Sequence, residues 1–204
     1  MQKNFLDHVY DARDAEETRA LYDAWAASYE AEVGANGYVT PDRCAAALAR
    51  FTDDLAAPVL DFGCGTGLSG AALRKAGFTC IDGVDLSRDM LQQARAKPVY
   101  RNLRQIEAGD PPVDTPGHYA AIAAIGVIGA GAAPIGTFDT LMSCLGTGGK
   151  LVLSFNDHAL KDPVYEARLS EWIDCGAARL LFSENGPHLP ARNIKSKVYV
   201  IEKT

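Results

Sequence analysis

The sequence predicts an α/β protein with a doubly wound, seven-stranded and mostly parallel sheet. From residue 58 onwards, short apolar segments alternate with helical segments, which is typical of strands joined by helical crossovers. A glycine-rich turn follows the first apolar segment. The last two extended segments have no helical pattern between them, so they are expected to pair as an antiparallel hairpin at one end of the sheet.

Residues 14–54 precede this alternation and are expected to form two helices. Asp14, followed by Glu17, resembles a capping box at a helix N-terminus. The first helix is supported by apolar and aromatic residues at helical spacing: Leu21, Tyr22, Trp25, Ala26 and Tyr29. After a break, Thr40 is expected to cap the second helix, with Pro41 at its first helical position.

The remaining elements follow in order along the chain. Strands are expected over 59–62, 79–84, 101–107, 119–125, 151–155, 178–183 and 195–202. Helices are expected over 68–76, 87–96 and 134–144, and another begins near Asp162. The fully apolar segment 119–125 suits the centre of the sheet, where both faces are covered. The stretch 184–193, rich in Gly and Pro, is expected to be a loop between the last two strands.

Length and composition indicate the class of protein. A chain of 204 residues is expected to be a single domain, with residues 1–55 as an N-terminal helical cap and 56–204 as the core. Its 48% of hydrophobic residues argues against disorder, and its net charge of −6 argues against a nucleic-acid partner. The five cysteines lack a Cys-x-x-Cys pair, which favours buried, reduced thiols. No apolar stretch is long enough to span a membrane and residues 1–8 do not resemble a signal peptide, so we expect a cytoplasmic protein without a membrane partner.

A glycine-rich turn lies between the first predicted strand and the next helix: Asp61-Phe62-Gly63-Cys64-Gly65-Thr66-Gly67. Ligands bind at such turns in open α/β sheets, and Asp85 ends the second strand about 20 residues on, where ribose hydroxyls are bound. Gly65, Gly67 and Gly70 also match the dinucleotide fingerprint. However, the Asp61 carboxylate would repel a pyrophosphate and attract a cation. The residues therefore favour S-adenosylmethionine, which carries an ammonium and a sulfonium, over NAD; a glycine turn that binds nothing is the third interpretation.

Four motifs resemble, in the same order, those of the class I S-adenosylmethionine-dependent methyltransferases. They are Asp61-x-Gly63-x-Gly65-x-Gly67, Gly83-Val84-Asp85-Leu86-Ser87, Gly109-Asp110 and Leu145-Gly146-Thr147-Gly148-Gly149-Lys150-Leu151. The resemblance implies a Rossmann-like methyltransferase fold with S-adenosylmethionine as cofactor. A narrower resemblance, to the branch that includes the methyltransferase-like protein of the Williams–Beuren region, comes from Leu21-Tyr22-Asp23-x-Trp25-Ala26-x-x-Tyr29-Glu30 and Gly37-Tyr38.

The resemblance also implies which residues bind the cofactor. The methionine part would face Asp61 and the backbone of Gly63, Cys64 and Gly65, and Gly67 would let the helix pack closely.

Asp85 would accept hydrogen bonds from both ribose hydroxyls, because a carboxylate has two acceptor oxygens. Leu86 and Met90 would lie against the adenine ring, Asp110 would accept from its amino group, and Ile125 would border the site. The alternative is that Leu86, Met90 and Ile125 are core residues and that Asp110 belongs to a turn.

Two aromatic residues of the N-terminal segment are candidates for the same site. Trp25 and Tyr29 lie four residues apart, so they share a helix face with Tyr22. They form either a core stripe that docks the helix or a lid in which Trp25 or the Tyr29 hydroxyl reaches the methionine end.

Methyl transfer needs a base only if the acceptor must lose a proton. The segment 126–134, where amino-methylating relatives carry an Asn-Pro-Pro-Tyr type motif, has no side chain that accepts a proton. This departure counts against methylation of DNA or of glutamine amides. His158 is a candidate base, with a solvated loop histidine as the competing interpretation, and His188 is the second candidate. His8 and His118 lie outside any recognisable constellation, and no cluster has metal-ligand spacing, so no metal is expected.

No large insertion is present that would form a platform for a macromolecule. The expected function is therefore methyl transfer to a small molecule, by an in-line displacement that relies mainly on positioning. The acceptor would be covered by the N-terminal helices and the 184–193 loop. Two alternatives stay open: a non-catalytic module that binds S-adenosylmethionine or S-adenosylhomocysteine, and an NAD-dependent oxidoreductase.

Overall fold

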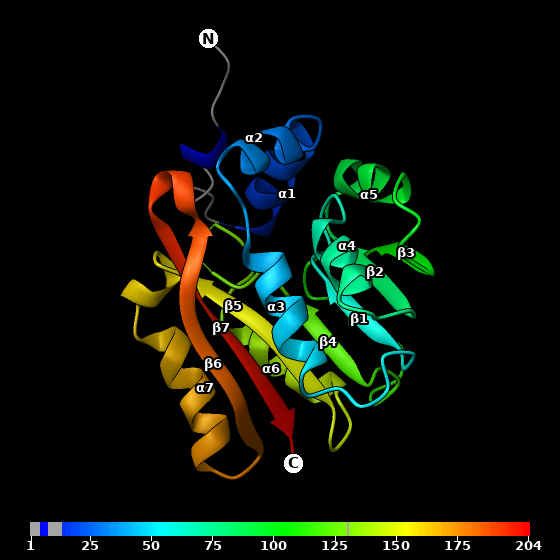
Figure 1. Ribbon diagram of the computed structural model, residues 1–204, viewed down its shortest axis with the longest axis vertical. Coiled ribbons are helices and arrows are strands. Elements are labelled where there is room, and N and C mark those ends of the chain that lie inside the picture. The colour runs from blue at the N-terminus through cyan, green and yellow to red at the C-terminus, as the bar shows by residue number, and fades with distance from the viewer. Residues whose placement is uncertain (1–4, 8–13, 130) are drawn as a thin grey trace.

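A computed structural model of the protein places residues 5–7, 14–129 and 131–204 (Figure 1). Its centre is one seven-stranded sheet in the order β3-β2-β1-β4-β5-β7-β6. The strands are β1 (Val59–Phe62), β2 (Ile81–Asp85), β3 (Asn102–Gln105), β4 (Ala121–Ala124), β5 (Lys150–Asn156), β6 (Ala178–Leu189) and β7 (Ile194–Lys203). The first five are parallel, and β7 is antiparallel to both of its neighbours. The predicted mostly parallel sheet with a terminal antiparallel hairpin is confirmed.

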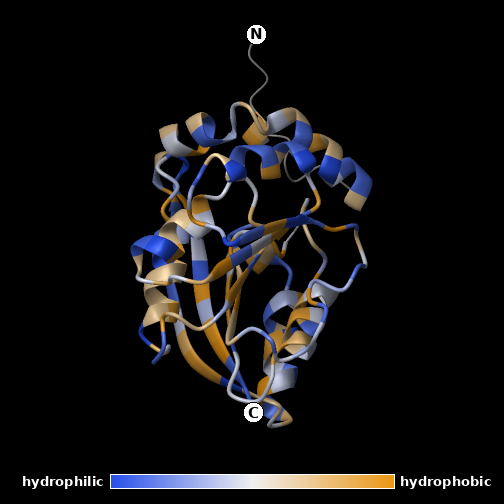
Figure 2. Ribbon diagram, turned by 90° about the vertical axis from the view of Figure 1, so that its right-hand side faces the viewer, coloured by the Kyte–Doolittle hydropathy of each residue, from blue (hydrophilic) through white to orange (hydrophobic). Residues whose placement is uncertain are grey.

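Helices cover both faces of this sheet, because alternate residues of the central strands point to opposite sides. On one face, α3 (Thr40–Ala49) and α4 (Leu68–Lys75) pack on Ala121, Ala123 and Val152. On the other, α6 (Gly136–Cys144) and α7 (Val164–Asp174) enclose a core with the residues in between, such as Ile122 and Leu153. The helix α5 (Arg88–Arg95), which connects β2 to β3, contacts both of these strands. Figure 2 shows the hydrophobic strands inside this layered arrangement.

Two short helices, α1 (Ala15–Trp25) and α2 (Tyr29–Ala35), lie across the edge where the parallel strands end (Figures 1 and 2). Asp14 caps α1 as expected, since its carboxylate accepts the N–H groups of Glu16 and Glu17. The prediction of one helix through Tyr29 is wrong. The chain turns after Trp25, and the bend lets Glu32 reach back to the Trp25 indole N–H at 2.7 Å.

The next helix, α3, begins with Thr40 and Pro41 as its first two helical residues, one position earlier than expected, and Val39 is its N-cap. The Thr40 hydroxyl therefore does not cap the helix. Residues 40–49 pack against α4, β5 and β7, so they belong to a layer of the sheet, whereas α1 and α2 lie over its edge.

The prediction of a loop over 184–193 is wrong as far as Leu189, because β6 continues to that residue. Only the turn Pro190–Arg192 and Asn193 connect β6 to β7. An edge strand tolerates Gly186 and Pro187 because a missing N–H on its outer side breaks no ladder bond, and the register shifts between Pro187 and Leu189. Among the described residues, no helix is long and apolar enough to cross a membrane.

Candidate functional site

The glycine turn after β1 is tightly shaped by its surroundings. Gly63, Gly65 and Gly67 all have positive φ, at 69°, 52° and 94°. A Cβ on Gly63 would lie 2.5 Å from a methyl carbon of Val127, whereas one on Gly65 would meet nothing within 4 Å. Gly63 is thus required by packing, and Gly65 opens onto space that a ligand can approach closely. Gly67 lies against α5, where a Cβ would be 3.5 Å from the Cα of Ala94.

Two fully buried polar atoms of this region have no hydrogen-bond partner among the described residues: Asp61 Oδ1 and Thr66 Oγ1. The other Asp61 oxygen accepts bonds from Ser69 Oγ and Tyr100 Oη, both at 2.7 Å. Burial raises the pKa of Asp61 to about 6, and the two hydroxyl donors oppose this rise. Because buried polar atoms are normally paired, the free oxygen of Asp61 fits a cationic donor on a ligand.

Asp85 ends β2 beside this turn. Its two carboxylate oxygens accept the backbone N–H groups of Gly65 and Ser87, each at 2.8 Å. Burial raises its pKa, and these two bonds oppose the rise. Each oxygen has a second lone pair, so the carboxylate is held in place and can still accept from a diol. The N–H groups of Gly63 and Cys64 both donate to Val84 O, at 2.8 and 3.0 Å.

The residues expected around the adenine ring are spread over different environments. Leu86 packs at the edge of the core, and Met90 is buried beneath the N-terminal helices together with Trp25. Asp110 is exposed and accepts the N–H of Glu107 at 2.9 Å, as a turn residue does. Ile125 lies in the core on the α3 side.

Trp25 and Tyr29 approach each other across the bend between α1 and α2. Their ring centroids are 4.7 Å apart in an edge-to-face arrangement, and Tyr22 stacks on Trp25 at 5.8 Å. Burial raises the pKa of Tyr29 well above its usual value, and the nearby Tyr38 and Asp85 add to the rise. The Tyr29 hydroxyl is therefore protonated, close to the acid that ends β2.

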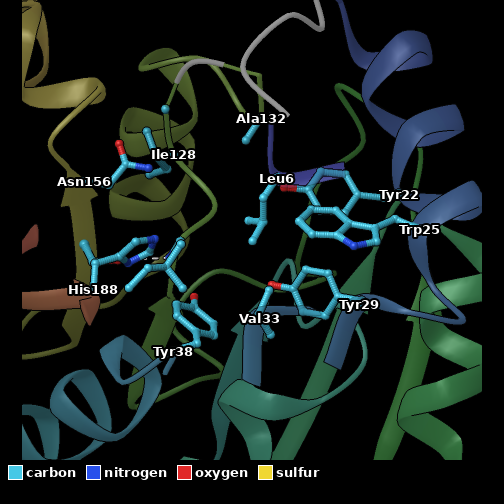
Figure 3. Close-up of a pocket in the computed structure, with 14 residues that line it drawn as sticks. Leu6, Tyr22, Trp25, Tyr29, Val33, Tyr38, Ile128, Ala132, Asn156 and His188 are labelled. Atoms are coloured by element: carbon cyan, nitrogen blue, oxygen red, sulfur yellow. Dashed lines mark hydrogen bonds between the residues drawn. The ribbon is translucent and has the colours of Figure 1, made fainter. Parts of the chain in front are cut away.

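A pocket lies between these rings and the carboxyl ends of β4 and β5 (Figure 3). Tyr22, Trp25 and Tyr29 form one wall, and His188, Asn156 and Ile128 face them from the other. The lining consists of Leu6, Tyr22, Trp25, Tyr29, Val33, Tyr38, Gly126, Ile128, Gly129, Ala132, Ser154, Asn156, His188 and Leu189. Within the described part of the chain, this lining contains no Asp, Glu, Lys or Arg.

The two candidate histidines lie in different places. His158 is outside the pocket lining, and burial and Lys161 lower its pKa. His188 is in β6, not in a loop, and it lines the pocket. His8 lies outside the described residues, and the His118 ring packs on Tyr119. No group of three or more His, Cys, Asp or Glu residues in the described ranges could hold a metal ion.

Sequence reasoning missed two features of the site. Thr40 bonds to His188, and the only signal was a threonine placed like a helix cap. Lys97 links the glycine turn to the N-terminal helices, since its ammonium donates to Thr66 O at 2.8 Å and to Glu30 Oε1 at 2.5 Å. Nothing in the local pattern around Lys97 points to this bridge.

A family model described as a methyltransferase domain matches residues 38–196 of the chain. The chain is also 36% identical to human methyltransferase-like protein 27 over 120 residues. This match covers 56% of the chain and 48% of the human protein, so it spans about half the length of that relative.

Solved structures show the same fold at low sequence identity. The cyclase SpnF superposes with a TM-score of 0.71 at 16% identity, covering 94% of this chain and 97% of that one. Magnesium protoporphyrin IX methyltransferase from Synechocystis PCC 6803, solved with bound S-adenosylmethionine, has a TM-score of 0.60 at 15% identity and covers 98% and 90%. The same fold thus occurs in a cyclase and in a methyltransferase, so the assignment of this chain to a methyltransferase family depends on the family match and not on the fold.

Proposed function

The chain belongs to the methyltransferase domain family, and on this premise we propose that it is an S-adenosylmethionine-dependent methyltransferase whose acceptor is a small molecule. The observation that carries the proposal is the pocket between the N-terminal aromatic residues and the ends of β4 and β5. It is a concave site lined mainly by apolar and aromatic side chains with a few polar groups, as small-molecule sites are.

The glycine turn fits the cofactor. We assign the unpaired oxygen of Asp61 to the methionine ammonium, the open side of Gly65 to the methionine backbone and Asp85 to the ribose hydroxyls. The N–H groups of Gly63, Cys64 and Gly65 all donate within the protein, so this turn offers few donors to a pyrophosphate. That arrangement supports S-adenosylmethionine over NAD.

The other expected contacts follow from position. We assign Leu86 and Met90 to the adenine side, and Trp25 and Tyr29 to the cover over the methionine end. We assign Asp110 to the adenine amino group and Ile125 to the border of the site; in the structure Asp110 accepts a hydrogen bond within its turn, and Ile125 packs in the core.

The cofactor supplies a methyl group that is already activated by the neighbouring sulfonium. The protein has to bind the acceptor, orient it toward that methyl group and exclude water. The aromatic wall of Tyr22, Trp25 and Tyr29 orients and shields, and no base is required unless the acceptor carries a proton at the attacking atom.

Calorimetry with S-adenosylmethionine, S-adenosylhomocysteine and NAD tests the cofactor, and transfer of a labelled methyl group to fractions of a cell extract tests the acceptor. We expect both adenosyl compounds to bind, NAD not to bind, and the label to appear in the low-molecular-weight fraction. Label in protein or nucleic acid instead would contradict the small-molecule proposal.

A further inference from the structure

A chain of hydrogen bonds ends at the histidine that lines the pocket. Thr40 Oγ1 lies 2.8 Å from His188 Nδ1 and 2.9 Å from Ser196 Oγ, and Arg43 Nη1 lies 3.0 Å from Ser196 Oγ. Thr40 and Ser196 are fully buried and His188 is 8% exposed. These residues lie in α3, β6 and β7, and neither the glycine turn nor the helices α1 and α2 contribute to this series of hydrogen bonds.

The direction of these bonds follows from what each group can donate. An arginine only donates, so Ser196 Oγ accepts from Arg43. The only acceptor for the Ser196 hydroxyl proton among the described residues is Thr40 Oγ1. Thr40 in turn donates to His188 Nδ1. The opposite direction would leave the buried Ser196 proton without an acceptor, which costs about 1–3 kcal/mol.

This direction decides the tautomer of His188. A neutral imidazole whose Nδ1 accepts a hydrogen bond carries its proton on Nε2. No described residue bonds to Nε2, and the ring lines the pocket (Figure 3). The Tyr38 ring packs edge-to-face against the His188 ring, with 5.1 Å between the ring centroids, and the backbone carbonyl of His188 accepts the N–H of Val39. Both contacts hold the imidazole in place. His188 therefore presents a rigid N–H donor to the pocket.

The imidazole is neutral at neutral pH. Burial lowers the pKa of His188 to about 4, Arg43 and His158 lower it further, and Asp157 opposes them. A neutral donor that holds no lone pair toward the pocket is not a base. The remaining lining groups with protons are hydroxyls, an amide and an indole, which do not accept a proton at neutral pH.

We propose that His188 binds the methyl acceptor through Nε2–H, and that the acceptor is a small aromatic or apolar carboxylate. The proposal rests on the proposed function. A carboxylate arrives without a proton at neutral pH, so it needs no base. One of its oxygens takes the His188 hydrogen bond, and the other is left to react. Its apolar body matches the rings of Tyr22, Trp25 and Tyr29.

The transfer balances without a proton. A lone pair of the acceptor oxygen forms the new O–CH₃ bond, the S–CH₃ bond breaks, and its electron pair stays on sulfur. One anion and one sulfonium cation become a neutral ester and a neutral thioether. A pocket without Asp, Glu, Lys or Arg favours such a reaction, because opposite charges disappear in a medium that solvates them poorly.

The tautomer is tested directly by NMR of protein labelled with ¹⁵N in its histidine rings, with His188 assigned through its backbone resonances. We expect Nε2 to be protonated and Nδ1 to be unprotonated across the neutral pH range. Thr40→Val should abolish the preference, and Thr40→Ser should restore it. An Nδ1–H tautomer, or an imidazolium at neutral pH, would overturn the proposal.

The acceptor class is tested by binding of benzoate, benzyl alcohol and benzylamine to protein saturated with S-adenosylhomocysteine. We expect benzoate to bind best, and His188→Phe, which keeps the ring and loses the donor, to weaken it about tenfold. His188→Gln, which restores an N–H, should recover part of the affinity, and His118→Phe, an exposed residue outside the pocket lining, should change nothing.

The two possible failures are distinguishable. If the wild-type protein does not bind S-adenosylhomocysteine, the proposed function fails. If it binds S-adenosylhomocysteine but prefers benzyl alcohol or benzylamine, binds none of the three probes, or keeps its benzoate affinity in a folded His188→Phe variant, only the inference about His188 fails.

Discussion

The two carboxylate oxygens of Asp61 have very different surroundings. One of its oxygens accepts two hydroxyl bonds, while the other is buried without a partner among the described residues. A buried carboxylate in this state destabilises the folded protein when it is charged, because desolvation disfavours the ionised form. The cost is tolerated where a bound cation offsets it, which is why such residues occur at binding sites.

The pKa of Asp61 predicts a pH dependence of stability. Its folded-state value, about 6, lies above the ordinary value of 3.8, so between the two the folded protein holds a proton that the unfolded chain has lost. The free energy of unfolding should therefore fall as the pH rises through this window, by about 2–3 kcal/mol. Urea unfolding should show a smaller fall in Asp61→Asn than in the wild type, because Asp85, whose pKa burial also raises, still contributes in the variant. Asp53→Asn, an exposed control, should keep the wild-type slope; an equal slope in Asp61→Asn would contradict the assignment.

Asp85 predicts a loss of cofactor affinity. Asp85→Ala removes the acceptor assigned to the ribose hydroxyls and the anchor of the Gly65 N–H. S-adenosylhomocysteine binding should weaken by about 1.5–3 kcal/mol, the range for hydrogen bonds to charged groups. Calorimetry measures this, with the exposed Asp89→Ala as the control. Equal affinities of the two variants would refute the role of Asp85.

The histidines show the limit of prediction at this scale. His158 and His188 were both plausible from the sequence, since each lies near the expected ligand-bearing edge. Which of them faces the pocket depends on the length of β6 and on the contact of His188 with Val39 and Thr40. These contacts join residues about 150 positions apart, so no local pattern reports them.

At the scale of elements, the glycines of the turn after β1 have different roles: Gly63 is required by packing, and Gly65 is assigned to cofactor binding. Gly63→Ala should destabilise the fold strongly, because its φ is positive and its Cβ would overlap Val127. Gly65→Ala should cost only about 1–2 kcal/mol for its positive φ, yet it should block the cofactor. Urea unfolding and S-adenosylhomocysteine binding separate the two effects. The assignment is wrong if Gly65→Ala binds normally, or if Val127→Ala does not relieve Gly63→Ala.

The N-terminal helices are joined to the glycine turn through Lys97. Lys97→Met keeps the aliphatic stem but loses the bonds to Thr66 and Glu30. We expect faster hydrogen exchange in α2 and weaker cofactor binding, with a stability loss below about 1 kcal/mol because the pair is partly exposed. Lys75→Met, which removes an exposed pair with Asp42, is the matched control. Unchanged exchange in α2 would show that the bridge does not hold the helix.

Elements with a strong local signal were predicted well. β4 was predictable because Ala121–Ala124 is covered on both faces and is apolar throughout. The break before α2 was not, because it is stabilised by a bond from Trp25 to Glu32 that forms only once the chain has turned. The extension of β6 was also missed, since Gly186 and Pro187 weaken an isolated strand but are compatible with an edge.

For the whole molecule, we expect cofactor binding to stabilise both the sheet and the helices above it. S-adenosylhomocysteine at 100 times its Kd should add about 2.7 kcal/mol to the free energy of unfolding. Among amides that exchange through local opening under native conditions, slowing should extend to α1 and α2, which pack over the site, and should be absent from α7, which packs with a separate core. Protection confined to the glycine turn would show that the cap is independent of the cofactor.

The position of β7 has a consequence for the order in which a nascent chain matures. β7 lies between β5 and β6, although β6 is synthesised first. When β6 has left the ribosome but β7 has not, β6 has no neighbouring strand with which it can pair. Ser196, which orients the pocket histidine, lies in the same late strand. The side of the pocket that carries His188 thus forms only after β7 has joined the sheet, so a chain that ends before β7 would have its glycine turn but no ordered His188.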